Sequence, residues 1–196
     1  MRTTRWRGLL LACLLVASLG AGCLSGDEGS TNGGGDGPPD EAPTAEIPRW
    51  ELGFAWTYTI DTQGFPSTET TMLVYDDDGN NYRVGTTDED QALIHALFNV
   101  NPQIGRIQKG NLAVYEDGEP RPMYDFPLTD GKTWETDFFV SQHGGTLTAE
   151  ATYSDAIETG AGTMPGYEIT ATNPAGFQVA YDYIPAIQWF SKLVVL

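Results

Sequence analysis

Cysteine and basic residues are scarce in this chain of 196 residues. Only two cysteines occur, Cys13 and Cys23, so the fold cannot depend on a network of disulfides. Ten Lys and Arg residues stand against 27 Asp and Glu residues, and the formal net charge is −17. Because binding to nucleic acid needs a basic face that neutralises phosphates, this composition argues against a nucleic-acid partner.

The residue patterns of several enzyme and metal-site classes are also missing. The sequence has no His-Glu-x-x-His, no Cys-x-x-Cys, no Gly-x-x-x-x-Gly-Lys-Ser/Thr and no Gly-x-Ser-x-Gly. Its only histidines are His95 and His143. We therefore predict no catalytic residue, no metal site and no cofactor, and we expect that the protein is not an enzyme. Paired carboxylates from distant strands are the one arrangement that such patterns do not exclude.

Long apolar runs are absent except at the N-terminus. The run Leu9–Leu19 has too few residues to span a bilayer, which needs about 20, but it suits the apolar core of a signal peptide. Arg2, Arg5 and Arg7 precede this run, and small residues follow it. We interpret residues 1–22 as a signal peptide that is removed on export.

At Cys23 this leader resembles the signal of prokaryotic lipoproteins, which is cut just before a Cys that receives diacylglycerol on its sulfur. That pattern usually has Leu three residues before the Cys, whereas here Gly20 stands there and Leu19 precedes it. The resemblance implies that Cys23 is the lipid attachment residue and that the protein is held outside a prokaryotic cell membrane. Leu10–Cys13 is a rival match, but it leaves a very short apolar core. An ordinary secretory signal without lipid is the other alternative.

Residues 23–48 have the composition of a flexible tether. After Cys23 the segment is rich in glycine, proline and acidic residues and has no apolar periodicity, so we expect it to be disordered. A coil of this length reaches about 25–30 Å. Three of the ten basic residues lie in the leader, so a chain that begins at Cys23 has seven basic and 27 acidic residues and a net charge of −20. Since anionic headgroups repel such a chain, lipid rather than charge should hold it to the membrane.

Residues 49–196 have the length of one domain with a core of its own. Apolar and polar residues alternate in several segments, which predicts strands with one buried face: Phe54–Ile60, Thr146–Tyr153, Tyr167–Ala171 and Phe177–Tyr183. Turns rich in Gly and Asn separate these segments at short intervals, so most neighbours should pair as antiparallel hairpins. We predict a mainly β fold of about nine or ten strands, arranged as a curved antiparallel sheet, an open barrel or a sandwich, with one short helix.

The segment Asp88–Asn99 predicts that helix. Thr87 or Asp88 can cap it, and acidic residues in its first turn suit the helix dipole. Its apolar residues form one stripe that we expect to cover a face or a mouth of the sheet: Leu93, Ile94, Leu97 and Phe98. His95 should lie at the edge of this stripe, as a structural residue and not as a ligand.

Two segments share a Gly-x-x-Trp spacing, Gly53–Trp56 and Gly131–Trp134, and the chain closes with Trp189–Lys192. At these residues the chain resembles a loose group of exported, β-rich prokaryotic proteins without an assigned function. The resemblance spans most of residues 50–195. It implies export and a β architecture, and it implies no catalytic or binding residue.

One turn has the composition of a divalent-cation site. Asp76–Asn81 holds three Asp and two Asn residues, but its Gly is fourth, whereas an EF-hand loop needs Gly in the sixth place. Tyr75 and Tyr82 flank it, as expected for a hairpin. We therefore interpret it as a solvated turn, with weak calcium binding as the alternative. His143–Gly145 is likewise predicted to be a hairpin turn.

These observations favour an exported, lipid-anchored and non-catalytic cell-surface module whose ligand or protein partner the sequence does not identify. A carrier of an apolar ligand is the alternative, and it requires an apolar internal cavity. A hydrolase is a distant third, and it requires a cleft that holds titratable groups with shifted pKa values.

Overall fold

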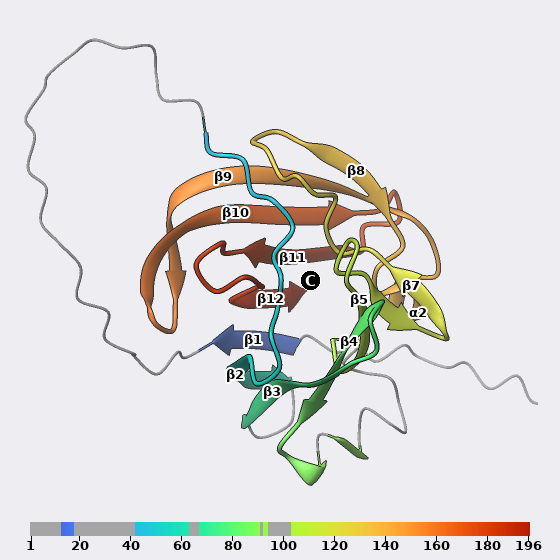
Figure 1. The fold of residues 1–196 in the computed structure, drawn as a ribbon. Coiled ribbons are helices and arrows are strands. Elements are labelled where there is room, and N and C mark those ends of the chain that lie inside the picture. The colour runs from blue at the N-terminus through green and yellow to red at the C-terminus, as the bar shows by residue number, and fades with distance from the viewer. Residues whose placement is uncertain (1–12, 18–41, 63–66, 91, 94–102) are drawn as a thin grey trace, which may run out of the picture.

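The computed structural model describes residues 13–17, 42–62, 67–90, 92–93 and 103–196 (Figure 1). Strands dominate this part of the chain. Their bounds are β1 Cys13–Ala17, β2 Ala55–Thr62, β3 Thr68–Asp77, β4 Asn81–Thr86, β5 Gly105–Gln108, β6 Val114–Glu116, β7 Glu119–Arg121, β8 Thr133–Thr136, β9 Leu147–Thr159, β10 Gly162–Thr172, β11 Gln178–Tyr183 and β12 Lys192–Val195.

All neighbouring strands pair antiparallel, in the order β7-β6-β5-β4-β3-β2-β1-β12-β11-β10-β9-β8. β1, which lies within the expected leader, joins two open sheets that together hold the other eleven strands. One sheet runs from β7 to β2 and the other from β12 to β8. The predicted fold class, mainly β and antiparallel with a short helix, is confirmed. There are more strands than predicted because β5, β6 and β7 are too short to show an alternating pattern.

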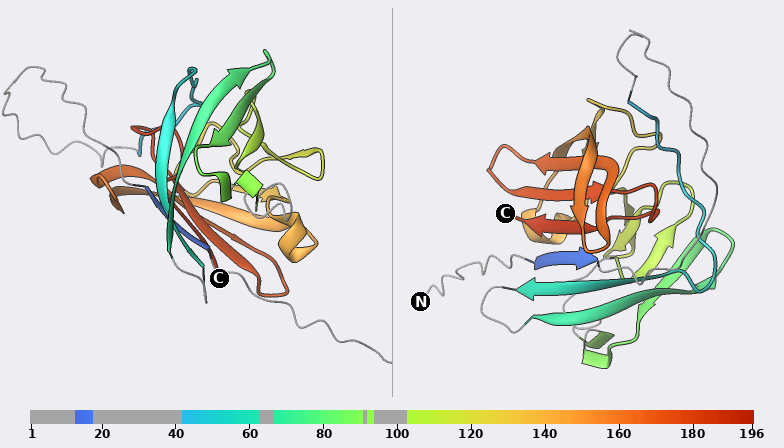
Figure 2. Two further views of the ribbon diagram at one scale, coloured as in Figure 1. Left: turned by 90° about the horizontal axis from the view of Figure 1, so that it is seen from below. Right: turned by 90° about the vertical axis from the view of Figure 1, so that its left-hand side faces the viewer.

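The two sheets curve around a shared interior (Figure 2). Register shifts at Val74/Asp76 in β3 and at Met164/Gly166 in β10 mark bulges, which add local bend and twist. At the far edges, the Thr136 Oγ1 hydroxyl at the end of β8 donates to the carbonyl oxygen of Pro122, next to β7, over 2.5 Å. Side chains rather than a backbone ladder therefore connect these two edges.

The interior is filled largely by aromatic side chains. The largest fully buried ones include Trp189, Tyr58, Tyr124, Tyr167 and Tyr183. A buried hydroxyl needs a hydrogen-bond partner, and the Tyr58 and Tyr124 hydroxyls each donate to a backbone carbonyl over 2.9 Å. These side chains give the core both apolar area and a fixed geometry.

The alternation predicted from the sequence is confirmed in the long C-terminal strands. Leu147, Ala149 and Ala151 of β9 are buried while their neighbours are exposed, and Ile169 and Ala171 of β10 continue the same face. β11 departs from this rule, because it buries residues on both of its faces at its end.

The helix α2 (Val140–His143) was not predicted. His143–Gly145 does lie in the connection of the antiparallel pair β8–β9, as predicted, but this connection is longer than a tight turn and contains α2. His143 ends this helix, and Gly144 closes it with a left-handed φ of 68° before β9 begins. Of the predicted helix Asp88–Asn99, residues 89–90 and 92–93 are helical and Asp88 precedes them without helical structure. Residues 91 and 94–99, His95 included, fall outside the described part of the chain. Leu93 is 57% exposed, so this member of the expected stripe is uncovered.

Cys23 and residues 24–41 of the expected tether also fall outside the described residues. The last residues before position 49 are described, and they contact the domain. Ala45 is buried and exchanges two backbone hydrogen bonds with Leu128, of 3.0 and 2.8 Å. In the described part of the chain, no helix has the length and apolarity needed to cross a membrane.

Candidate binding pocket at Trp50

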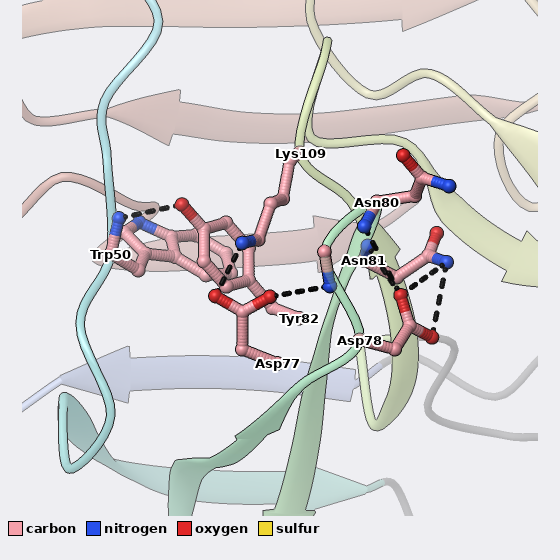
Figure 3. A network of polar contacts seen from close by, with 8 residues as sticks. Trp50, Asp77, Asp78, Asn80, Asn81, Tyr82 and Lys109 are labelled. Atoms are coloured by element: carbon pink, nitrogen blue, oxygen red, sulfur yellow. Dashed lines mark hydrogen bonds and ion pairs between the residues drawn. The ribbon is translucent and has the colours of Figure 1, made fainter.

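A surface pocket of about 430 Å³ lies where the end of the expected tether meets two hairpin turns (Figure 3). One wall is the segment Ile47–Trp50. The other wall comes from Tyr82, at the start of β4, and from Lys109 and Gly110, in the turn after β5. The pocket is open to solvent, and segments far apart in the sequence form it.

Trp50 fixes one wall of the pocket. Its backbone N–H donates to the Tyr82 hydroxyl over 2.9 Å, and its indole N–H donates to the Gln188 carbonyl over 3.0 Å. Its ring centroid lies 4.9 Å from Trp56, 5.0 Å from Tyr82 and 4.8 Å from Trp189. With both N–H groups bonded and three rings around it, Trp50 is fixed in place and is only 5% exposed.

Two cations line the same pocket, although basic residues are scarce in this chain. The Lys109 ammonium lies 4.8 Å from the centre of the Tyr82 ring and pairs with the Asp77 carboxylate. Its hydrogen bond is the main cause that lowers the pKa of Asp77 below the usual value. Arg49 is exposed, and its guanidinium has no ion pair among the described residues. The pocket can therefore offer positive charge beside two rings that are largely buried, those of Trp50 and Tyr82.

The turn predicted as the best cation candidate lies beside this pocket, but its carboxylates have other partners. Asp77 accepts the Gly79 backbone N–H over 2.8 Å, and Asp78 accepts the Asn81 backbone N–H over the same distance. Asp78 also pairs with Arg83 over 3.1 Å. Among the described residues there is no group of three His, Cys, Asp or Glu residues that could hold a metal ion. The geometry is that of a hydrogen-bonded hairpin turn.

Asp182 lies on the outward face of the strand predicted at Phe177–Tyr183, and the expectation that only one face of this strand is buried is wrong at this residue. It is only 4% exposed, because the chain after β11 folds back over it. Its carboxylate accepts the Ser191 backbone N–H and hydroxyl, each over 2.5 Å, and the Lys192 N–H over 3.4 Å. Burial raises the pKa of Asp182 to about 6 despite these bonds. The carboxylate joins β11 to the start of β12.

Glu116, in β6, is a second buried acid that the sequence did not reveal. One carboxylate oxygen accepts the Phe139 backbone N–H over 2.6 Å, and Phe139 has a left-handed φ of 63°. The other oxygen has no partner among the described residues, and burial raises the pKa of this group. His143 is also structural, since its ring bonds to the Phe138 carbonyl and the Gly145 N–H. Glu116 therefore holds the start of α2 against β6, and His143 joins the residues on either side of α2.

Comparison of the chain with protein-family models, with curated proteins and with solved structures gives no match. The resemblance at the Gly-x-x-Trp segments and the resemblance at Cys23 therefore stay predictions. Few features of the sequence predict the pocket. Lys109–Gly110 is a recognisable turn, but nothing around Trp50 indicates that this residue packs against β4 and the segment before β12.

Proposed function

We propose that the protein is an exported, lipid-anchored and non-catalytic module that a prokaryotic cell holds at the outer face of its membrane. Diacylglycerol on Cys23 is the anchor, and the acidic segment after it is the tether. The β domain then acts as a rigid body that binds a ligand or a partner protein. The Trp50 pocket is a candidate ligand site on that body.

The observation that carries this proposal is the way the expected tether enters the domain. The Pro43 carbonyl accepts a hydrogen bond from the Tyr167 hydroxyl, Ala45 pairs with Leu128, and Trp50 inserts among aromatic rings. Any pull on a lipid at Cys23 would reach the domain through this segment. Because this segment is bonded to the domain at several residues, it connects the anchor to the domain rigidly. Such a connection suits a module that must stay at the membrane.

The surroundings of the shifted acids support a role without catalysis. A catalytic acid or base needs a suitable pKa and also access to a substrate. Asp182 and Glu116 have raised pKa values, but both are buried and bonded to backbone N–H groups of their own fold. Asp77, which pairs with the Lys109 of the pocket, has a lowered pKa and is a weaker base for that reason.

The alternative, a carrier of an apolar ligand, finds no support among the residues that the structure describes. A carrier needs free apolar volume inside the fold. The described interior is instead packed with side chains such as Trp189, Tyr124, Phe138 and Phe190, all of them buried. We therefore place the ligand or partner on the surface of the domain.

The test is metabolic labelling with an alkyne fatty acid in a prokaryotic host that expresses the full chain with its own leader. The wild type should be labelled, should partition into a detergent phase, and should be digested by protease added to intact cells. Cys23→Ser should lose the label, whereas Cys13→Ser should keep it. Label on the Cys23→Ser protein, or protection of the wild type from external protease, would refute the proposal.

A further inference from the structure

The gap between β2 and β12 is one strand wide, and β1 fills it (Figure 1). The backbone of β1 pairs with β2 from Cys13↔Thr62 to Ala17↔Tyr58. On its other side it pairs with β12 at Leu15↔Leu193 and Val16↔Lys192. This strand alone connects the two open sheets by backbone pairing in the described part of the chain.

β1 lies wholly within residues 1–22, the leader that is cut off on export if the proposed function is correct. Once the leader is cut, β2 and β12 each have an edge with free backbone N–H and C=O groups. Such edges are ready templates for a further strand, and proteins usually cover or block them. Here the two edges face each other across a single gap, so one added strand can satisfy both.

The two faces of the gap determine which strand fits. The position of Leu15 lies between Ile60 and Leu193, and both of these side chains pack in the core cluster, Leu193 with no exposure. The position of Val16 lies between Thr59 and the exposed Lys192. Paired residues in an antiparallel sheet point to the same face, so a fitting strand alternates apolar inward residues with outward residues of any polarity.

Side-chain contacts oppose direct closure of the gap. The Tyr58 hydroxyl donates to the Phe190 carbonyl, and the Trp56 indole N–H donates to the Ile187 carbonyl, both over 2.9 Å. The Tyr58 ring also stacks on Phe190 with 4.9 Å between centroids. These contacts hold β2 at a fixed place relative to the segment that precedes β12, and they would have to rearrange if β2 paired with β12.

We propose that in the mature protein this gap is a strand-acceptor site, which binds an extended segment of a partner protein with alternating apolar residues. The inference rests on the proposed function, since only removal of the leader empties the gap. The expected tether is a poor occupant because its glycines, prolines and acids do not alternate with apolar residues. A second mature copy is also a poor occupant, because a strand inserted in the gap needs both of its edges free, and every described strand of a copy is bonded to a neighbour on at least one edge. Strand addition of this kind is an established mode of peptide recognition.

The test uses the mature protein purified from membranes, with its mass measured first. The probe is a peptide of leader residues 11–19 with Cys13→Ser and added lysines for solubility, and the control peptide also carries Leu15→Lys. Bound probe should slow amide hydrogen exchange in Tyr58–Asp61 and Lys192–Val194 by about tenfold or more, whereas the control peptide should not. If these amides are already as protected as those of the β9–β10 pair without any peptide, the gap is closed and the inference is wrong.

Two variants separate loss of the site from loss of the fold. Ile60→Lys puts a charge on the inward face of the β2 edge and should abolish peptide binding, and Thr59→Lys puts it on the outward face and should preserve binding. In addition, Lys192→Cys should form a disulfide with a probe carrying Val16→Cys, and not with one carrying Leu14→Cys. Equal cross-linking of both probes would refute the register.

The mass of the purified protein distinguishes a failure of the proposed function from a failure of the strand-acceptor site. A retained leader would refute the proposed function and would leave the gap occupied by β1. A mature N-terminus at Cys23 with no binding of the probe would refute the strand-acceptor site alone. Disulfide-linked dimers of the Lys192→Cys protein in which β2 and β12 are protected would show a second copy as the occupant, and would also overturn the proposal of a partner protein.

Discussion

Replacing the buried Asp182 by Asn should abolish one pH-dependent part of the stability of this protein. The two side chains have the same shape, and Asn can still accept the Ser191 and Lys192 backbone N–H groups through its oxygen. Its amide N–H₂ can donate to the Ser191 hydroxyl, which then acts as acceptor. Asp182→Asn therefore removes the buried charge while the hydrogen bonds are kept.

The magnitude follows from the pKa. Burial, opposed by the three hydrogen bonds, raises the pKa of Asp182 from 3.8 to about 6 in the folded protein. The folded state then holds the proton more tightly than the unfolded state. This contribution to stability is fully present below pH 3.8, is lost as the pH rises through about 6, and is constant above that. One pKa unit corresponds to about 1.4 kcal/mol, so the loss is roughly 3 kcal/mol.

The assay is urea unfolding of the wild type and of Asp182→Asn from pH 4 to pH 8 in high salt, which screens the repulsion between the many other acids. The free energy of unfolding of the variant should rise relative to the wild type by roughly 2.5 kcal/mol across this range, because Asp182 is already partly past its unfolded pKa at pH 4, and most of the rise should lie between pH 4 and pH 6. Asp182→Ala serves as the control, because it leaves the buried Ser191 N–H without an acceptor and should cost about 1–3 kcal/mol. A difference between wild type and Asp182→Asn that does not change with pH would refute the reasoning.

Three further predictions concern Gly166 in β10, Trp50 at the end of the expected tether and Asp78 in the turn before β4. Gly166→Ala should cost roughly 1–3 kcal/mol of unfolding free energy, since a Cβ there would lie 2.6 Å from the Tyr183 carbonyl oxygen. Gly110→Ala is the control, because a Cβ there has no atom within 4 Å, and it should change the unfolding free energy by no more than about 0.5 kcal/mol. In the same unfolding experiment, Trp50→Ala should lower the unfolding free energy by roughly 3–5 kcal/mol, because the ring is buried among other rings. Arg49→Ala should leave it almost unchanged. Equal effects of the two substitutions would show that Trp50 is not part of the core. Millimolar calcium should change the Tm of the wild type and of Asp78→Asn equally, because the Asp78 carboxylate is already bonded to Asn81 and Arg83. A larger change of Tm for the wild type would reveal a calcium site.

The long strands could be predicted from the sequence because their alternation is regular over many residues. β9 and β10 bury one face and expose the other over most of their length, as the pattern of Ala149, Ala151 and Ile169 indicates. The three-residue strands β6 and β7 offer no period to detect. Their pairing depends on the turn between them and on neighbours distant in the chain.

Burial of acids and the position of the pocket could not be predicted, and the reason is tertiary. Asp182 occupies an outward position in the β11 alternation, and it is buried only because the following segment returns over that face and offers N–H donors. Trp50 directly follows a segment with the composition of a tether, yet it packs against Tyr82 and Trp189, which are far away in the sequence. Local patterns carry no information about such long-range contacts.

The central claim is that the mature protein begins at a lipid-bearing Cys23. Mass spectrometry of the N-terminal proteolytic fragment, taken from protein purified out of native membranes, tests it most directly. We expect a fragment that starts at Cys23 and carries the mass of a diacylglyceryl group. An unmodified Cys23, or a fragment that still contains residues 1–22, would contradict the claim.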